Sequence, residues 1–224
     1  MNKIVWFFAL CLPLNTLAQS EVLVDQRDDQ SYGIGEVNGQ IWMLENLNLE
    51  TDLSKKLSTK EEIRYPQIKG RWYHMNELDS ICPVDWRLPT ADDWIGYFDL
   101  LSKMTGAAPK INSRKADITI TKFSRHFDLF TADNPLNIVP AGIFQGSVFM
   151  YAPESADYWL QNLTTEKREQ NNKGYKPVKI SYPGKSHIHL FNEFTVIHSH
   201  DHHLELDEME LLRRFLIRCI KEDQ

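Results

Sequence analysis

The sequence predicts an α+β fold, because strand-like and helix-like segments occupy different parts of the chain. Strand patterns are grouped near the two ends, at residues 22–49 and again from residue 137 onward, and the clearest helical pattern begins between them at Thr90. A regular alternation of strand and helix, which is typical of parallel sheets, is not seen. A hydrophobic fraction of 42% and a mean hydropathy of −0.43 indicate an ordinary globular protein.

Residues 1–18 have the pattern of a secretory signal peptide. Lys3 precedes a short apolar run, and Thr16 and Ala18 occupy the −3 and −1 positions of a cleavage site after Ala18. The run is shorter than the ~20 residues that span a bilayer, and Leu10 before Cys11 is too large for a lipoprotein site. Retention as an N-terminal anchor is the alternative. We expect one mature domain over residues 19–224, secreted or held at the outer cell surface or in the periplasm.

The net charge excludes two classes of partner. The chain carries −6, and loss of Lys3 with the signal peptide makes this about −7. No basic stripe suits a nucleic acid, and no polybasic patch suits anionic lipids. We therefore expect no nucleic-acid partner and no membrane-spanning segment after processing.

The first half of the chain should contain a hairpin and two helices. Asn38-Gly39 supports the positive backbone angles of a two-residue turn, here between the extended runs 32–37 and 40–47. Residues 50–69 are polar and predict a surface loop, and residues 75–81 predict a short helix.

The second helix is marked by its start and its spacing. Thr90 and Asp93 form a pattern like a capping box, and Trp94, Phe98 and Leu101 follow at helical spacing, which predicts a core-facing stripe. Gly106 and Pro109 end it.

The second half is expected to be mainly extended. The predicted elements are a strand within 116–123, two short buried strands within 137–152, a polar loop over 164–186, an alternating segment over 187–198, a short helix over 204–215 and a buried strand over 215–221.

Cysteine usage predicts one disulfide bond. Only Cys82 and Cys219 remain after processing, and an even pair in an exported protein usually forms a bridge. Two free thiols, or two metal ligands, are the alternatives.

The chain resembles the Fibrobacter succinogenes major paralogous domain, a family of exported bacterial modules. The blocks that carry the resemblance are residues 24–48, "GRWYHMNELDSICPVDWRLPTADDW" (70–94), "NIVPAGIFQG" (137–146), "YW" (158–159) and "FLIRCIKE" (215–222). The block at 70–94 is also similar to the signature of formylglycine-generating enzymes. The resemblance implies a C-type-lectin-like single domain with long inserted loops. Trp159 is followed by Leu-Gln-Asn, and residues 164–203 look longer than the usual connection.

The residues do not favour catalysis. Cys82 has Asp79 and Asp85 nearby and no local histidine, so its thiolate would be disfavoured. Formylglycine-generating enzymes use two copper-binding cysteines in late loops, whereas only Cys219 follows Cys82 here. Asp92 and Asp93 are adjacent, which suits capping better than paired acid–base work. We expect no enzyme and no cofactor.

The His-rich segment "HSHDHH" is the main candidate for a metal. In a strand, His198, His200 and His202 would share one face and converge on Zn²⁺ or Cu²⁺. Asp201 or Glu205 would lie near, and His187 and His189 lie upstream. The alternative is a solvated loop that binds nothing specific.

Calcium is less favoured. The Asn-Pro turn within residues 132–137 is similar to that of sugar-binding lectins, but the usual preceding acid is missing.

These observations favour an exported, non-catalytic interaction module that binds a cell-surface protein or a glycan through inserted loops. An exported metal-binding protein that uses the tract His198–His203 is the alternative.

Overall fold

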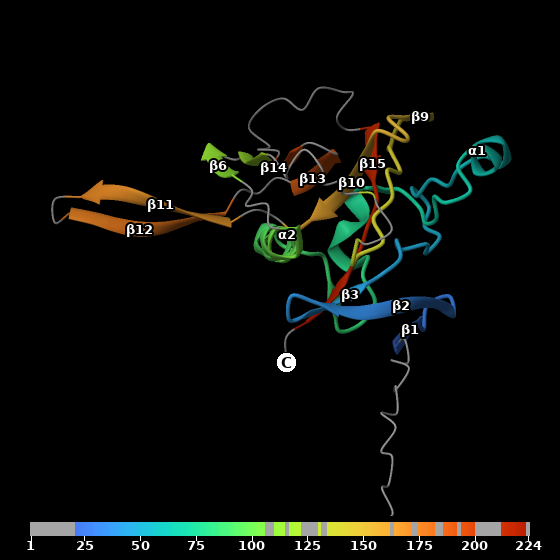
Figure 1. The fold of residues 1–224 in the computed structure, drawn as a ribbon, viewed down its shortest axis with the longest axis horizontal. Coiled ribbons are helices and arrows are strands. Elements are labelled where there is room, and N and C mark those ends of the chain that lie inside the picture. Colours follow the sequence, from blue (N-terminus) through green and yellow to red (C-terminus); the bar gives the residue numbers. More distant parts are fainter. Residues whose placement is uncertain are drawn as a thin grey trace, which may run out of the picture.

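The fold was analysed in a computed structural model of the 224-residue chain, which describes residues 21–105, 110–114, 117–121, 130, 134–161, 164–171, 174–181, 186–191, 194–199 and 212–222. Antiparallel sheets surround a central helix (Figure 1). The predicted α+β class is confirmed.

The first sheet joins the two ends of the described chain. Its strand order is β1 (Glu21–Asp25), β2 (Gln30–Val37), β3 (Gln40–Met43), β16 (Ile220–Lys221) and β5 (Trp86–Arg87). Asn38 and Gly39 have φ of +53° and +78°, as a tight turn between twisted strands requires. The predicted hairpin is confirmed, although β3 ends at Met43. Ile220 pairs with both Trp42 and Arg87, so the last strand lies between two segments from the first half of the chain.

The second sheet has four short strands. Its order is β4 (Tyr73–His74), β15 (Arg213–Phe215), β8 (Ile143–Gln145) and β9 (Val148–Met150). The two strands expected within 137–152 are therefore present but shorter. The helix expected over 204–215 is wrong at its end, because residues 213–215 pair with both β4 and β8. The other residues of that prediction, 204–211, lie outside the described residues.

The third sheet contains the most sequence-distant pairings. Its order is β10 (Ser155–Leu160), β13 (Ser186–Phe191), β14 (Phe194–Ser199), β7 (Asp117–Thr121) and β6 (Lys110–Arg114). The strand expected within 116–123 is β7, and the alternating segment 187–198 forms β13 and β14. Parallel bridges link β10 to Gly142 and Leu216, which ties this sheet to the rest of the frame.

A separate two-stranded hairpin contradicts the loop predicted over 164–186. β11 (Thr164–Asn171) pairs in full with β12 (Gly174–Ser181). Its polar residues hid the pattern, because neither strand shows the alternation that marks a half-buried strand. In Figure 1 the hairpin extends away from the body of the protein.

The helices agree with the sequence at two places out of three. The expected short helix is the 3₁₀ helix η1 (Met75–Ser80), and the expected long helix is α2 (Ala91–Thr105). A third, α1 (Thr59–Arg64), lies inside the predicted loop 50–69 and corrects that prediction. Ser58 and Glu61 form a reciprocal capping box there, but α1 buries no residue, so no apolar stripe announced it.

Two groups of buried side chains form the core. Helix α2 supplies Trp94, Tyr97 and Phe98, all fully buried, to the larger group. Trp42 packs edge-on against Trp94 with ring centroids 5.3 Å apart. The smaller group surrounds Cys219 and includes Trp86, Leu88, Trp159 and Phe215. Trp94 was expected to pack around the bridge and instead belongs to the larger group. None of the described helices is long and apolar enough to span a membrane.

Candidate functional site

The two cysteines predicted to pair do form a disulfide bond. Their Cα atoms are 5.9 Å apart and the bridge closes a loop of 137 residues. Cys82 follows η1, and Cys219 is fully buried directly before β16. The bridge removes Cys82 as a nucleophile, because only a thiolate attacks. It thus joins the segment before α2 to the end of the chain.

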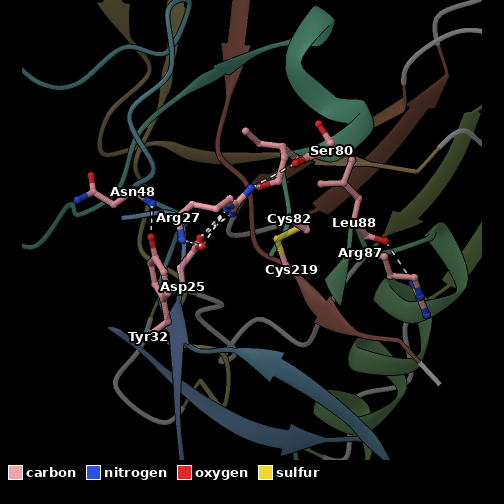
Figure 2. The surroundings of a disulfide bond; sticks show 10 residues. Asp25, Arg27, Tyr32, Asn48, Ser80, Cys82, Arg87, Leu88 and Cys219 are labelled. Atoms are coloured by element: carbon pink, nitrogen blue, oxygen red, sulfur yellow. Dashed lines mark hydrogen bonds and ion pairs between the residues drawn. A yellow bond between two sulfur atoms is a disulfide. The ribbon is translucent and has the colours of Figure 1, made fainter. Parts of the chain in front are cut away.

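A buried ion pair reinforces the bridge from the N-terminal side (Figure 2). Asp25 is 1% exposed, and Arg27 Nη2 lies 2.6 Å from its Oδ2 atom. Arg27 Nη1 also donates to the backbone carbonyls of Ser80 and Ile81, at 3.3 and 2.9 Å. The hydrogen bond from Arg27 lowers the pKa of Asp25. These contacts fasten the turn after β1 to the residues just before Cys82.

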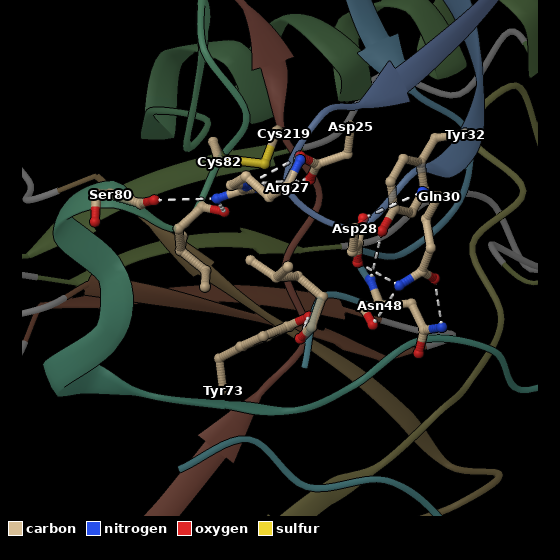
Figure 3. A network of polar contacts seen from close by, with 12 residues as sticks. Asp25, Arg27, Asp28, Gln30, Tyr32, Asn48, Tyr73, Ser80, Cys82 and Cys219 are labelled. Carbon is tan, nitrogen blue, oxygen red and sulfur yellow. Dashed lines mark hydrogen bonds and ion pairs between the residues drawn. A yellow bond between two sulfur atoms is a disulfide. The ribbon is translucent and has the colours of Figure 1, made fainter. Parts of the chain in front are cut away.

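A second polar network lies on the other side of Asp25 (Figure 3). Asn48 Nδ2 donates to Gln30 Oε1 at 2.7 Å, and Gln30 Nε2 donates to Asp28 Oδ2 at 2.5 Å. Asn48 N donates to the Tyr32 hydroxyl at 3.0 Å. Burial raises the pKa of Tyr32 to about 12, so this hydroxyl stays neutral at physiological pH. The network closes the hairpin onto the following segment.

The surface beside the bridge is hollowed in two places. The larger hollow, about 440 Å³, is lined by residues that include Ser80, Cys82, Arg87, Gln161 and Glu222. Arg87 already donates to Asp93 Oδ2 at 2.8 Å. The smaller hollow, about 280 Å³, is lined mainly by polar residues of the network around Gln30 and Asn48. Because these polar groups bond to one another, both hollows are explained as parts of the frame.

A buried cation holds the end of the chain. Arg218 is 1% exposed and Nη2 donates to Asn46 Oδ1 at 2.7 Å. Its Nη1 atom donates to the carbonyl of Leu136, and its guanidinium lies 5.6 Å from the ring centre of Tyr158. The Tyr158 hydroxyl shares the same Asn46 acceptor at 3.1 Å. Arg218, in the Arg-Cys pair, is therefore structural.

The carboxylates considered for catalysis also have structural roles. Asp93 Oδ2 accepts from Thr90 N and Oγ1, at 2.7 and 2.8 Å. Asp93 N donates back to Thr90 Oγ1 at 3.2 Å. The predicted cap of α2 is thereby confirmed, and it occupies the carboxylate suggested for acid–base work.

The Asn-Pro turn is part of the core. Asn134 Oδ1 accepts from the Tyr97 hydroxyl at 2.6 Å and from Leu136 N at 2.9 Å. Asn134 is buried, so its oxygen is engaged in holding the turn against α2.

Two histidines and an aspartate meet on the third sheet. Asp157 of β10 lies opposite His189 of β13 in the register. The His189 Nδ1 atom contacts Asp157 Oδ1, and its Nε2 atom lies 2.6 Å from Nε2 of His187. Asp157 is 1% exposed and accepts a second hydrogen bond from Ser155 Oγ at 2.7 Å. Sequence reasoning noted both histidines but missed Asp157, because its partner lies on another strand.

The predicted metal tract is described only at its first residue. His198 lies in β14, whereas residues 200–203 fall outside the described residues. Among the described side chains, no group of three or more His, Cys, Asp or Glu is arranged to hold a metal ion. The tract therefore stays a prediction.

The hairpin β11–β12 is the main feature that the sequence analysis misread. Strands β10 and β13 are direct neighbours, and Leu160 pairs with Ser186. The chain nevertheless leaves the sheet between them to form a second hairpin of two eight-residue strands. Such strands extend about 25 Å. The register sets Glu166 opposite Lys179 and Glu169 opposite Lys176.

Comparison with known families gives one match. The Fibrobacter succinogenes major domain matches residues 36–221, which includes every strand from β3 to β16 and the three described helices. Neither the curated proteins nor the solved structures contain a match. The match spans the two cysteines of the bridge, the buried Arg218 and the inserted hairpin. The chain therefore belongs to the Fibrobacter succinogenes major domain family.

Proposed function

We propose that this protein is an exported, non-catalytic interaction module that binds a cell-surface protein or glycan through inserted segments, chiefly the hairpin β11–β12. The observation that carries the proposal is the place of this hairpin, which interrupts two strands that pair directly with each other. A turn of two to five residues would connect such strands. The additional chain is not needed to close the sheet, so a role outside the frame is the simplest reason for it.

Export is supported by the pairing of Cys82 with Cys219. Disulfide bonds persist mainly in oxidising compartments, and they are rare where thiols are kept reduced. The signal peptide proposed for residues 1–18 would bring the chain to such a compartment.

The lectin-like part of the proposal is supported by the way the frame closes. β16 lies between β3 and β5, so strands from both ends of the described chain meet in one sheet. C-type-lectin-like domains close in this manner and present long segments from the closed frame. We propose the same division of labour here, with the bridge and Arg218 in the frame and the hairpin as the binding segment.

The hairpin also has a charge that suits a particular partner. Residues 164–181 contain five lysines and arginines and two glutamates, although the whole chain carries −6. The register pairs each glutamate with a lysine, and it sets Lys167 and Arg168 opposite Val178 and Pro177. Opposite charges steer association. An anionic glycan or an acidic protein surface is therefore the partner we favour.

A non-catalytic role is supported by the occupied side chains of the frame. The bridge takes Cys82, the cap of α2 takes Asp93, and the pair with Arg27 takes Asp25. These contacts account for groups that catalysis would otherwise use.

The proposal is tested with the full mature chain and a variant in which residues 164–181 are replaced by a short Gly-Ser linker. Both are applied to an array of neutral and anionic glycans, and to bacterial envelope fractions treated with either protease or periodate. We expect binding that the linker variant loses, with an unchanged melting temperature for the frame. Sensitivity to protease or to periodate then identifies a protein or a glycan partner.

A charge-matched pair of variants sharpens the test. Lys167→Glu with Arg168→Glu changes the hairpin, and Lys56→Glu with Lys60→Glu makes the same change beside α1. We expect the first pair to weaken binding at least tenfold and the second to leave it unchanged. Equal effects of the two pairs, or binding that survives the linker replacement, would show that the hairpin is not the binding segment. Turnover of any bound glycan would overturn the non-catalytic reading.

A further inference from the structure

The strand β13 carries two histidines that face one another in a His-x-His arrangement. Alternate residues of a strand share one face, and here the Nε2 atoms of His187 and His189 lie only 2.6 Å apart. Two imidazole nitrogens bound to one tetrahedral zinc ion at 2.0–2.1 Å would lie about 3.3 Å apart. A small rotation of either ring therefore suffices to admit an ion between them.

Asp157 prepares His189 for this role. Its carboxylate accepts from the His189 Nδ1 atom, which places the ring hydrogen on Nδ1 and leaves the Nε2 lone pair directed at His187. Ser155 Oγ donates to the other carboxylate oxygen at 2.7 Å and so fixes the orientation of Asp157. A carboxylate on the distal nitrogen is the usual outer partner of a metal-bound histidine.

The surroundings hold the rings in place. The His187 ring stacks on Phe215 with centroids 4.5 Å apart, and the Trp159 ring lies edge-on at 6.0 Å. His187 is 1% exposed, whereas the side chain of His189 is 19% exposed. The pair is thus held on its inner side and reachable by solvent on its outer side.

A third imidazole comes from the neighbouring strand. The register of β13 and β14 sets His198 directly opposite His187. Opposed residues of antiparallel strands lie on the same face, with Cβ atoms about 5 Å apart. By contrast, the outer members of His198, His200 and His202 would be about 14 Å apart along an extended strand. Positions on two adjacent strands therefore suit a single ion better than positions along one strand.

We propose that His187, His189 and His198 form a three-histidine site for a Zn²⁺-class ion, in which Asp157 is the positioning residue. Imidazole ligands suit Zn²⁺ and Cu²⁺, and three protein ligands leave a fourth position for water or for an oxygen donor of a ligand. The site is separate from the hairpin β11–β12, so it holds whether or not the hairpin binds a partner.

The test is titration of the chelator-treated mature chain with Zn²⁺ at pH 7.5, followed by calorimetry, and with Co²⁺, followed by visible absorption. We expect one ion per chain, an intense tetrahedral Co²⁺ spectrum and a rise in melting temperature with added Zn²⁺. Binding should weaken as the pH falls, because imidazole ligands must be neutral. His198→Ala should lower the affinity at least a hundredfold, and Asp157→Asn should lower it 10- to 100-fold.

The matched control changes only the histidines beyond β14. A chain with His200→Ala, His202→Ala and His203→Ala should keep one-to-one binding and its Co²⁺ spectrum. Loss of binding in this control would place the metal in the tract and overturn the proposal. Weak binding of several ions, or none, by the unchanged chain would overturn it as well. Circular dichroism of each variant, and the His198→Ala result in particular, separates loss of a ligand from loss of the fold, since His187 is buried.

Discussion

The guanidinium of Arg27 connects the carboxylate of Asp25 to the backbone carbonyl of Ile81, the residue before Cys82. One side chain thus links the first strand of the fold to the disulfide bond. Because Asp25 is 1% exposed, loss of Arg27 would leave a buried carboxylate without its main partner. We expect Arg27→Ala to lower the free energy of unfolding by about 2–3 kcal/mol, measured by urea denaturation at pH 7. Lys56→Ala, which removes an exposed ion pair with Glu62, should cost less than about 1 kcal/mol.

The same pair gives stability a dependence on acid. Arg27 holds the pKa of Asp25 below its ordinary value of 3.8. A carboxyl group with a lowered pKa stabilises the fold above its unfolded pKa, and this contribution disappears as the pH falls through the folded value. We therefore expect the unfolding free energy of the unchanged chain to drop more between pH 5 and pH 2 than that of Asp25→Asn. Asp52→Asn, at an exposed position, serves as the control. Parallel curves for the unchanged chain and Asp25→Asn would contradict the prediction.

The disulfide bond should contribute through the long loop that it closes. Chain-entropy arithmetic for 137 residues gives roughly 5 kcal/mol, and measured bridges commonly give about 2–4 kcal/mol. We expect Cys82→Ser with Cys219→Ser to lower the unfolding free energy within that range. A reductant should destabilise the unchanged chain to a similar degree and leave the double variant unaffected. Two alkylatable thiols in the native, exported protein would refute the bridge.

Gly142 is required by both conformation and space. Its φ is +62°, and an added Cβ would lie 2.3 Å from the carbonyl oxygen of Met150. Gly39 also has positive φ, at +78°, but an added Cβ there would meet nothing within 4 Å. We expect Gly39→Ala to cost about 1–2 kcal/mol from the left-handed backbone alone, and Gly142→Ala to cost more than that. Thermal unfolding of the two variants measures the difference, and equal losses would show that the frame relaxes around Gly142.

The cap of α2 provides a local test. Thr90 and Asp93 exchange hydrogen bonds across the first turn. Thr90→Ala should lower stability by about 1 kcal/mol, whereas Thr90→Ser keeps the hydroxyl and should cost a smaller amount. Chemical denaturation of both variants checks this, and an equal loss in Thr90→Ser would assign the effect to packing of the Thr90 methyl group.

The sequence by itself determined the parts of this protein whose signals are local. Asn38-Gly39 specified its turn because few residue pairs tolerate two positive φ angles. Thr90, Asp93 and the spacing of Trp94, Phe98 and Leu101 specified α2, because capping and helical periodicity act within a few residues. Counting the cysteines left after processing was enough to pair Cys82 with Cys219.

Only the tertiary structure decided what depends on partners far away in the chain. α1 buries nothing and β11–β12 pair only with each other, so neither carries the apolar pattern from which an element is predicted. Residues 213–215 looked helical, yet pairing with β4 and β8 makes them a strand. Asp157 and His189 are opposed by strand register across residues 161–185, and register is a property of the assembled sheet. Local propensity is weak enough that such long-range contacts override it.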